Sequence, residues 1–145
     1  MLARTSDYGE RPQDSLMNYN PIPEDIARFV LDKIDSVAQL EALLLLRGNP
    51  KKEWDVAAVA KSLYVDENQA HATLVRLVEE SLVVVLPREP ARYRYDPVSQ
   101  ELQKMVDRLS EIYSKHLVPV TNLIHSKPST RVREFADAFK FRKDD

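Results

Sequence analysis

The stretch from Asp55 to Tyr95 constrains the fold of this chain more than any other part of the sequence. It reads as a short helix, a tight turn, a second helix, a strand, a loop and a second strand. Asp55 and Asp66 each precede apolar residues at helical spacing, so each is expected to cap a helix. Tyr64 and Val65 form the turn between them. This order predicts a helix-turn-helix unit.

A β-hairpin is expected directly after the second helix. Residues 83–86 are apolar and mostly β-branched, which is typical of a buried strand. In residues 92–95, charged and aromatic side chains alternate, which places Arg92 and Arg94 on one face and two tyrosines on the other. The loop between the strands carries Arg88, so the tip of the hairpin is expected to be locally positive.

This order of elements resembles the winged helix-turn-helix of bacterial transcriptional regulators, in particular MarR-like families in the broad sense. The resemblance covers residues 36–95 and rests on three runs, which are Val56-Ala-Ala-Val-Ala-Lys-Ser-Leu, Asp66-Glu-Asn-Gln and Leu74-Val-Arg-Leu-Val-Glu-Glu-Ser-Leu-Val. Two positions that often hold Gly in such proteins hold Tyr64 and Ser81 here. The resemblance implies a mainly α fold with a small antiparallel hairpin and extra flanking helices. It also implies a homodimeric, DNA-binding regulator of transcription in the bacterial cytoplasm.

Helices are expected before this unit. Pro23 and the acidic residues after it suit a helix start, and apolar spacing predicts helices over residues 23–34 and 36–47. Ser36 and Gln39 read as a capping box between them. One continuous, kinked helix is the alternative. Just before the helix-turn-helix, Trp54 is expected to pack on the core or to start a very short strand.

A long helix over residues 97–118 is expected after the hairpin. At about 22 residues it would be about 33 Å long, so it needs a second surface to bury its apolar stripe. The stripe has heptad spacing, which predicts a dimer seam. The seam consists of Leu102, Met105, Leu109, Ile112 and His116. His116 is expected to be a packed or pairing residue, and Pro119 is expected to kink or stop the helix.

The resulting domain prediction has three parts. Residues 1–22 form an N-terminal arm, residues 23–127 the winged-helix domain, and residues 128–145 a C-terminal helix and tail. The apolar side of that last helix includes Phe135 and Phe139. These rings either cover the domain's own core or dock a protein partner.

Composition and motifs argue against catalysis and against a cofactor. The chain has no Cys and only two Gly, which rules out disulfides and a glycine-rich phosphate loop. Its three His lie far apart in sequence, without the spacing of a helical metal site. No apolar run approaches the length of a membrane span. We therefore expect a non-enzyme without a metal or an organic cofactor, located in the cytoplasm.

DNA reading is predicted from the outward face of the second helix and from the hairpin. The expected contacts are Asn68, Gln69, Ala72, Thr73 and Arg76 on the helix and Arg88, Arg92 and Arg94 on the hairpin. Glu67, Glu79 and Glu80 share the helix with Arg76, and Arg76 can instead pair with Glu80. The formal charge is −2. An acidic helix fits two alternatives, a simple solvated face or a protein-interaction module with little DNA binding.

Overall fold

The computed structural model describes residues 21–127 of the 145-residue chain. Its elements are α2 (Glu24–Lys33), α3 (Val37–Arg47), α4 (Val56–Leu63), α5 (Glu67–Glu79), β1 (Val83–Leu86), β2 (Arg92–Tyr95), α6 (Gln100–Lys115) and α7 (Leu117–Ser126). The predicted C-terminal helix and tail lie outside the described residues, as does the predicted arm up to residue 20. Ile22, which the sequence assigned to the arm, is instead buried in the core.

The predicted caps form because each is a short side chain that accepts a hydrogen bond from a backbone N–H three residues later. The Ser36 hydroxyl accepts a hydrogen bond from Gln39 N at 3.0 Å. The Asp55 carboxylate accepts one from Ala58 N at 2.8 Å, and the Asp66 carboxylate accepts one from Gln69 N at 2.7 Å. The chain therefore breaks between α2 and α3, and two helices are confirmed there. The Gln39 amide completes this corner, since it accepts from Asp35 N and donates to Lys33 O.

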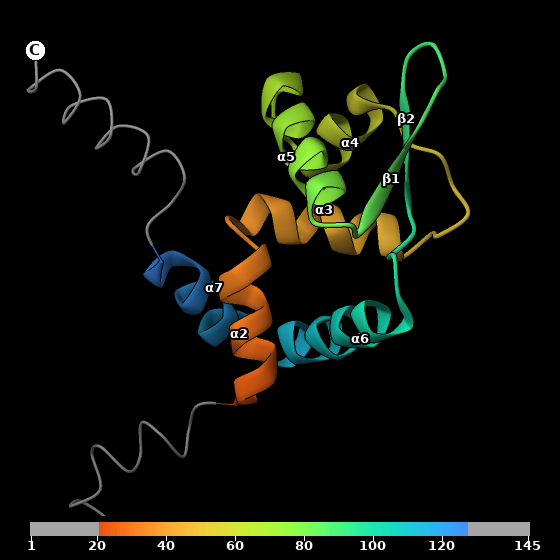
Figure 1. The fold of residues 1–145 in the computed structure, drawn as a ribbon. Helices are drawn as coiled ribbons and strands as arrows, with labels where there is room; N and C mark the ends of the chain where they lie inside the picture. The colour runs from red at the N-terminus through yellow and green to blue at the C-terminus, as the bar shows by residue number, and fades with distance from the viewer. Residues whose placement is uncertain (1–20, 128–145) are drawn as a thin grey trace, which may run out of the picture.

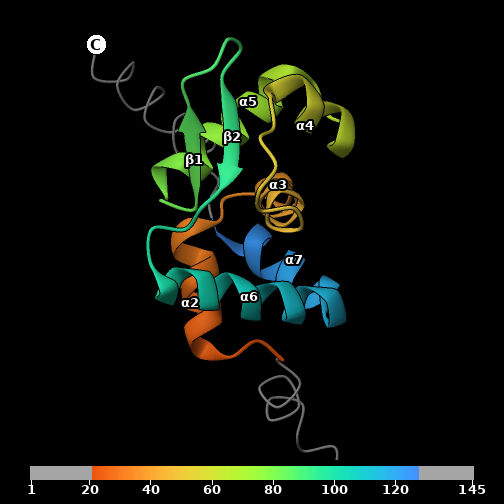
Figure 2. The same cartoon turned by 90° about the vertical axis from the view of Figure 1, so that its right-hand side faces the viewer.

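The elements form two layers, which Figures 1 and 2 show from two sides. One layer holds α4, α5 and the hairpin, and the other holds α2, α6 and α7. Helix α3 lies between them and contacts α4, α5 and β2. Its apolar face supplies much of the core. The fully buried side chains include Ile26, Leu40, Leu43, Leu46, Leu74, Leu77, Leu109 and Ile124. No helix within residues 21–127 is long and apolar enough to cross a membrane.

The hairpin has the alternation that the sequence predicts. Strands β1 and β2 pair antiparallel, with Val84 opposite Arg94 and Leu86 opposite Arg92. Tyr93 and Tyr95 are buried, whereas both arginines remain partly exposed. Trp54 forms a single bridge with Tyr93 and is itself buried, so it both packs on the core and extends the sheet as expected.

The predicted long helix is wrong at both ends. Helix α6 starts at Gln100 rather than at residue 97, because the Ser99 hydroxyl caps Leu102 N at 3.1 Å. It ends at Lys115, and a second helix, α7, begins at Leu117. Pro119 explains the break, since it has no N–H for the carbonyl four residues earlier and its ring is tolerated only in a first helical turn.

The predicted dimer seam is largely part of the monomer's own core. Leu109 is fully buried, and Leu102, Met105 and Ile112 pack partly buried against the same core. Helix α6 is held to α3 by an ion pair from Arg47 to Asp107 at 2.9 Å. The heptad spacing therefore reflects burial of α6 against α2 and α7 and provides no evidence for a coiled coil.

Two turns adopt a backbone that usually favours glycine. Tyr64 ends α4 with φ of 59°, and Ser81 follows α5 with φ of 65°. They are the two positions where winged-helix regulators often hold Gly. Both turns therefore place a residue with a Cβ in a backbone conformation that glycine adopts more readily.

Candidate nucleic-acid interface

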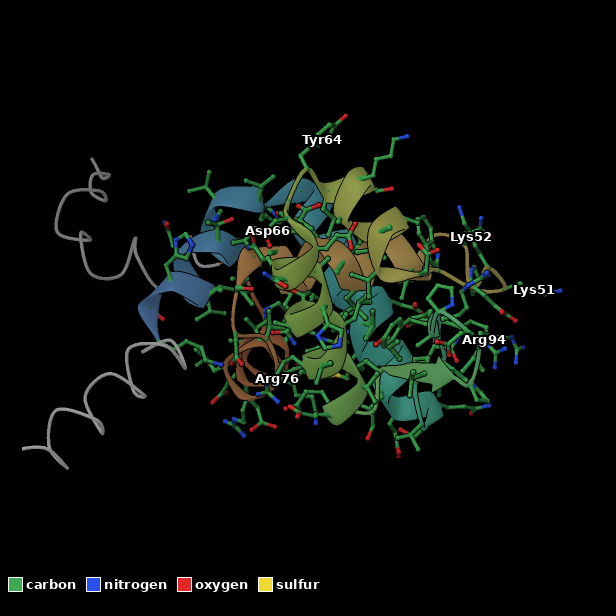
Figure 3. The ribbon with its side chains drawn as sticks, turned by 90° about the horizontal axis from the view of Figure 1, so that it is seen from above. Lys51, Lys52, Tyr64, Asp66, Arg76 and Arg94 are labelled. Carbon is green, nitrogen blue, oxygen red and sulfur yellow. The ribbon has the colours of Figure 1, made fainter. Side chains whose placement is uncertain are left out.

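The first turns of α5 form the most open part of the helix-turn-helix. Asn68, Gln69 and Ala72 are exposed, as the sequence predicts, and so is His71 beside them. These side chains emerge from a rigid frame, because α5 packs on α3, α4 and β1. Tyr64, in the turn before α5, is 94% exposed. Figure 3 shows it at the rim of this surface.

Thr73 is placed differently from the prediction. It was expected at the rim of α5, yet it is only 8% exposed. The reason is that α3, α4 and β1 all pack on α5. The buried face of α5 is therefore wider than that of a helix that packs on one neighbour only. Thr73 is therefore a packing residue in this structure and is not available to a base or a phosphate.

Arg76 is also corrected, because its guanidinium is engaged within the chain. It donates to Asp35 at 2.6 Å and forms an ion pair with Glu80. Figure 3 places Arg76 far from the hairpin arginine Arg94. The alternative pairing with Glu80 is thus confirmed, and the side chain is used for structure.

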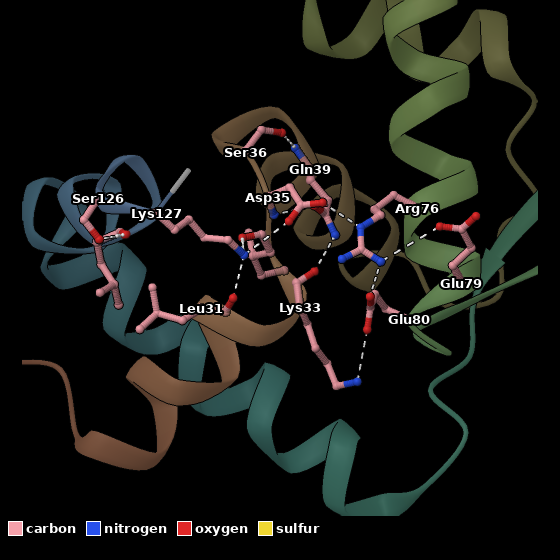
Figure 4. Close-up of polar contacts among 12 residues, drawn as sticks. Leu31, Lys33, Asp35, Ser36, Gln39, Arg76, Glu79, Glu80, Ser126 and Lys127 are labelled. Atoms are coloured by element: carbon pink, nitrogen blue, oxygen red, sulfur yellow. Dashed lines mark hydrogen bonds and ion pairs between the residues drawn. The ribbon is translucent and has the colours of Figure 1, made fainter. Parts of the chain in front are cut away.

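These contacts belong to a network that joins three helices, drawn in Figure 4. Lys127, at the end of α7, donates to Leu31 O at 2.5 Å, to Ile34 O at 3.0 Å and to Asp35 at 3.2 Å. Burial raises the pKa of Asp35, but hydrogen bonds from Arg76 and Lys127 outweigh burial and leave that pKa below its usual value. Asp35 therefore stays ionised at neutral pH and links α5 to α7.

The hairpin arginines form the second part of the candidate interface. Arg88 holds Glu53 through two contacts of 3.2 Å each. Arg94 lies 3.6 Å from Asp96, and the Nε of Arg92 is buried without a hydrogen-bond partner. All three arginine residues are at least partly exposed.

Two lysines extend this positive surface. Lys51 and Lys52 are exposed in the loop before α4, and Figure 3 shows both on the same side as Arg94. The Lys52 ammonium lies 3.9 Å from the centre of the Trp54 ring, a cation–π contact within the loop, and the bridge from Trp54 to Tyr93 joins this loop to the wing. We call Lys51, Lys52, Arg88, Arg92 and Arg94 the wing cluster.

A hollow of about 360 Å³ lies between α5 and the wing. Its lining mixes the N-terminal ends of α4 and α5 with the second strand. The lining residues include Asp55, Glu67, His71, Pro90, Ala91 and Tyr93. Asp55 and Glu67 place two carboxylates in this lining, whereas the arginines of the wing lie outside it.

Two residues of the candidate interface, Glu53 and Tyr64, were not predicted from the sequence. Glu53 sits among the wing arginines, but it is 35 residues from Arg88 and no local pattern marks that pairing. Tyr64 was read only as a turn residue, although an exposed aromatic at a turn is itself a signal. Among residues 21–127, no group of three or more His, Asp and Glu side chains is arranged to hold a metal ion.

The predicted dimer residues do not form one exposed seam. Leu109 is buried, and Leu102, Met105, Ile112 and His116 are only partly exposed. Two adjacent apolar residues lie just beyond them at the start of α7, Leu117 and Val118, which are 53% and 62% exposed. The corner where α6 meets α7 is thus a better candidate for contact with another chain.

A search of solved structures found several chains that resemble this one. The Mycobacterium tuberculosis protein RV1404 has a TM-score of 0.50 and 17% identity, over 94% of this chain and 90% of that one. Sco5413, a MarR family transcriptional regulator from Streptomyces coelicolor, has a TM-score of 0.48 and 18% identity, with 91% of each chain covered. The homodimeric winged helix-turn-helix DNA-binding domain Mb0332 from Mycobacterium bovis has a TM-score of 0.46 and 20% identity, over 80% of this chain and 94% of that one.

No protein-family model matches the sequence, and no curated protein matches it. At these identities the similarity to the solved structures concerns the fold alone. The element order and the hairpin register themselves define a winged helix-turn-helix with additional helices on both sides.

Proposed function

We propose that this chain is a DNA-binding regulator of transcription that acts as a homodimer in the bacterial cytoplasm. The observation that carries the proposal is the wing cluster, which lies on the same face as the exposed first turns of α5. In a helix-turn-helix the second helix enters the major groove with its N-terminal residues leading. A positive wing beside it is placed to hold the phosphate backbone.

The two parts of the interface have different roles in this proposal. Asn68 and Gln69 carry amides that can pair with adenine edges, and Ala72 can contact a thymine methyl group. Arg88, Arg92 and Arg94 meet phosphates, together with Lys51 and Lys52. Because α5 also carries exposed Glu67 and Glu79, we expect most of the affinity to come from the backbone contacts.

The test is a titration of a non-specific DNA duplex at about 50 mM salt, repeated at rising salt. Wild-type protein is expected to bind, with an affinity that falls steeply as salt rises. Arg92→Ala combined with Arg94→Ala is expected to weaken binding about tenfold or more and to flatten the salt slope by about one for each lost contact. Binding is measured by fluorescence anisotropy of the labelled duplex.

A matched control removes the same charge from the other layer. Arg28→Ala combined with Lys115→Ala deletes two cations that form exposed pairs within α2 and α6. This variant should bind almost as well as wild type. Absence of wild-type binding at about 50 mM salt would refute the DNA proposal. Equal losses in both double variants would show that only net charge matters and would refute the role of the wing.

One observation favours a second candidate function. The hollow between α5 and the wing is flanked by Asp55 and Glu67, and α5 has no free arginine because Arg76 is occupied. Such a surface suits a basic protein segment, as in winged helices that serve as protein-interaction modules. This candidate predicts no DNA binding at low salt, so the same titration separates the two.

A further inference from the structure

Glu53 occupies Arg88 in the way that a phosphate group would. The two side chains come from different segments, the loop before α4 and the tip of the wing. Arg88 Nε lies 3.2 Å from one Glu53 oxygen, and Arg88 Nη2 lies 3.2 Å from the other. This two-pronged contact is the geometry in which a guanidinium also binds two oxygens of a phosphate.

The charge of Glu53 is secured by the wing cluster itself. The hydrogen bond from Arg88, assisted by the nearby positive charges of Arg92 and Arg94, lowers the pKa of the Glu53 carboxyl. Glu53 is therefore a carboxylate at any pH at which DNA binding would be measured. Its side chain is 30% exposed and that of Arg88 is 48% exposed, so an incoming phosphate can reach the pair.

We propose that Glu53 is an intramolecular competitor that DNA phosphate must displace from Arg88. This inference rests on the proposed function and assigns a regulating residue to that interface. While the contact is closed, Arg88 contributes little to backbone binding. When phosphate takes its place, the released carboxylate remains beside the DNA and opposes binding by charge repulsion. Glu53 thus acts as a built-in brake on sequence-independent binding.

The experiment compares Glu53→Gln with Glu89→Gln. Both remove one negative charge near the wing, but Glu89 is exposed at the tip and forms no ion pair within residues 21–127. With the non-specific duplex at about 50 mM salt, Glu53→Gln is expected to bind about threefold to tenfold more tightly than wild type. Its salt slope should steepen by about 0.9, the value for one added phosphate contact. Glu89→Gln should gain less than twofold, with an unchanged slope.

Arg88→Ala, placed in two backgrounds, separates competition from bulk charge. In wild type this change is expected to weaken binding less than it does in the Glu53→Gln background, because displacing Glu53 offsets part of the Arg88–phosphate contact. In the Glu53→Gln background it should abolish the gain in affinity and the added slope. A gain that persists without Arg88 would overturn the inference, and so would equal gains for Glu53→Gln and Glu89→Gln.

The two proposals fail in different ways. If neither wild type nor Glu53→Gln binds the duplex at about 50 mM salt, the DNA-binding function itself is refuted. If wild type binds and Glu53→Gln binds no better, only the competitor role is refuted. Thermal unfolding of each variant controls for folding, and the exposed position of the pair predicts midpoints close to wild type.

Discussion

Tyr64 and Ser81 carry a conformational cost that can be located to single residues. Both have a left-handed backbone, with φ of 59° and 65°. For a residue with a Cβ this conformation costs about 1–2 kcal/mol relative to the right-handed one. The Tyr64 ring makes no compensating packing contact, since the residue is 94% exposed.

Tyr64→Gly is therefore expected to stabilise the fold. Glycine removes the steric cost, although its freer unfolded state cancels about 0.5–1 kcal/mol of the gain. We expect the free energy of unfolding to rise by about 0.5–1 kcal/mol, measured by urea denaturation. Tyr64→Ala is the control, because it removes the ring but keeps the Cβ, and it should leave stability nearly unchanged. An equal gain in both variants would place the cost in the exposed ring instead of the backbone.

The ion network around Asp35 acts at the scale of whole elements. It joins the corner between α2 and α3 to the last turn of α5 through Arg76, and to the end of α7 through Lys127. Glu80 extends the network to Lys33 on α2, at 3.1 Å. The orientation of the candidate recognition helix is therefore fixed partly by the opposite layer.

Asp35→Asn is expected to lower the free energy of unfolding by about 2 kcal/mol at neutral pH, because two cations lose a charged partner. The pKa of Asp35 is lowered in the folded state, so its contribution is complete above the unfolded pKa of about 3.9 and is lost as pH falls through the folded pKa. The difference between wild type and the variant should therefore shrink below about pH 4. Urea denaturation across this pH range measures it.

Asp32→Asn provides the matched control for this pH dependence. Asp32 is exposed on α2 near the same corner, and within residues 21–127 it forms no ion pair. Its replacement should change stability by less than about 0.5 kcal/mol at any pH. A difference between wild type and Asp35→Asn that stays constant down to low pH would contradict the ionic role of Asp35.

Features set by neighbouring residues could be predicted from the sequence. The caps at Ser36, Asp55 and Asp66 depend on residues three positions away, and the alternation of Arg92 to Tyr95 depends on strand geometry alone. The helix-turn-helix and the hairpin follow from these local rules. The exposed positions of Asn68, Gln69 and Ala72 follow from helical period.

Features set by distant contacts could not be predicted in this way. Thr73 is buried because α5 has several neighbours, and helical period cannot reveal their number. Arg76 binds Asp35 across 41 residues of sequence, and Lys127 binds Asp35 across 92. The apolar spacing of α6 identified a buried stripe but could not distinguish its own core from a partner chain.

At the scale of the whole molecule, we place the contact surface of the proposed dimer at the corner between α6 and α7 instead of along the heptad seam of α6. Leu117 and Val118 are adjacent, apolar and more than half exposed. Two exposed apolar residues side by side, at the edge of the layer formed by α2, α6 and α7, are suited to burial against a second copy of the chain. The partly exposed His116, the one member of the predicted seam at this corner, would lie at the edge of that contact.

Leu117→Glu combined with Val118→Glu is expected to convert a dimer into a monomer, because charge would be buried in an apolar contact. Sedimentation equilibrium at micromolar concentration measures the mass. Gln103→Glu is the control, since it adds the same type of charge at an exposed polar position of α6. A wild-type chain that sediments as a monomer would refute the dimer. A double variant that remains dimeric would refute the location.

The place of Trp54 gives the molecule a natural optical reporter. It is the only tryptophan of the sequence, and it lies buried at the root of the wing, bridged to Tyr93 and covered by Lys52. Indole emission responds to the polarity and charge of its surroundings. The intrinsic fluorescence of this chain therefore comes from the point where the loop before α4 meets the wing, and it follows displacement of Lys52 without any attached dye.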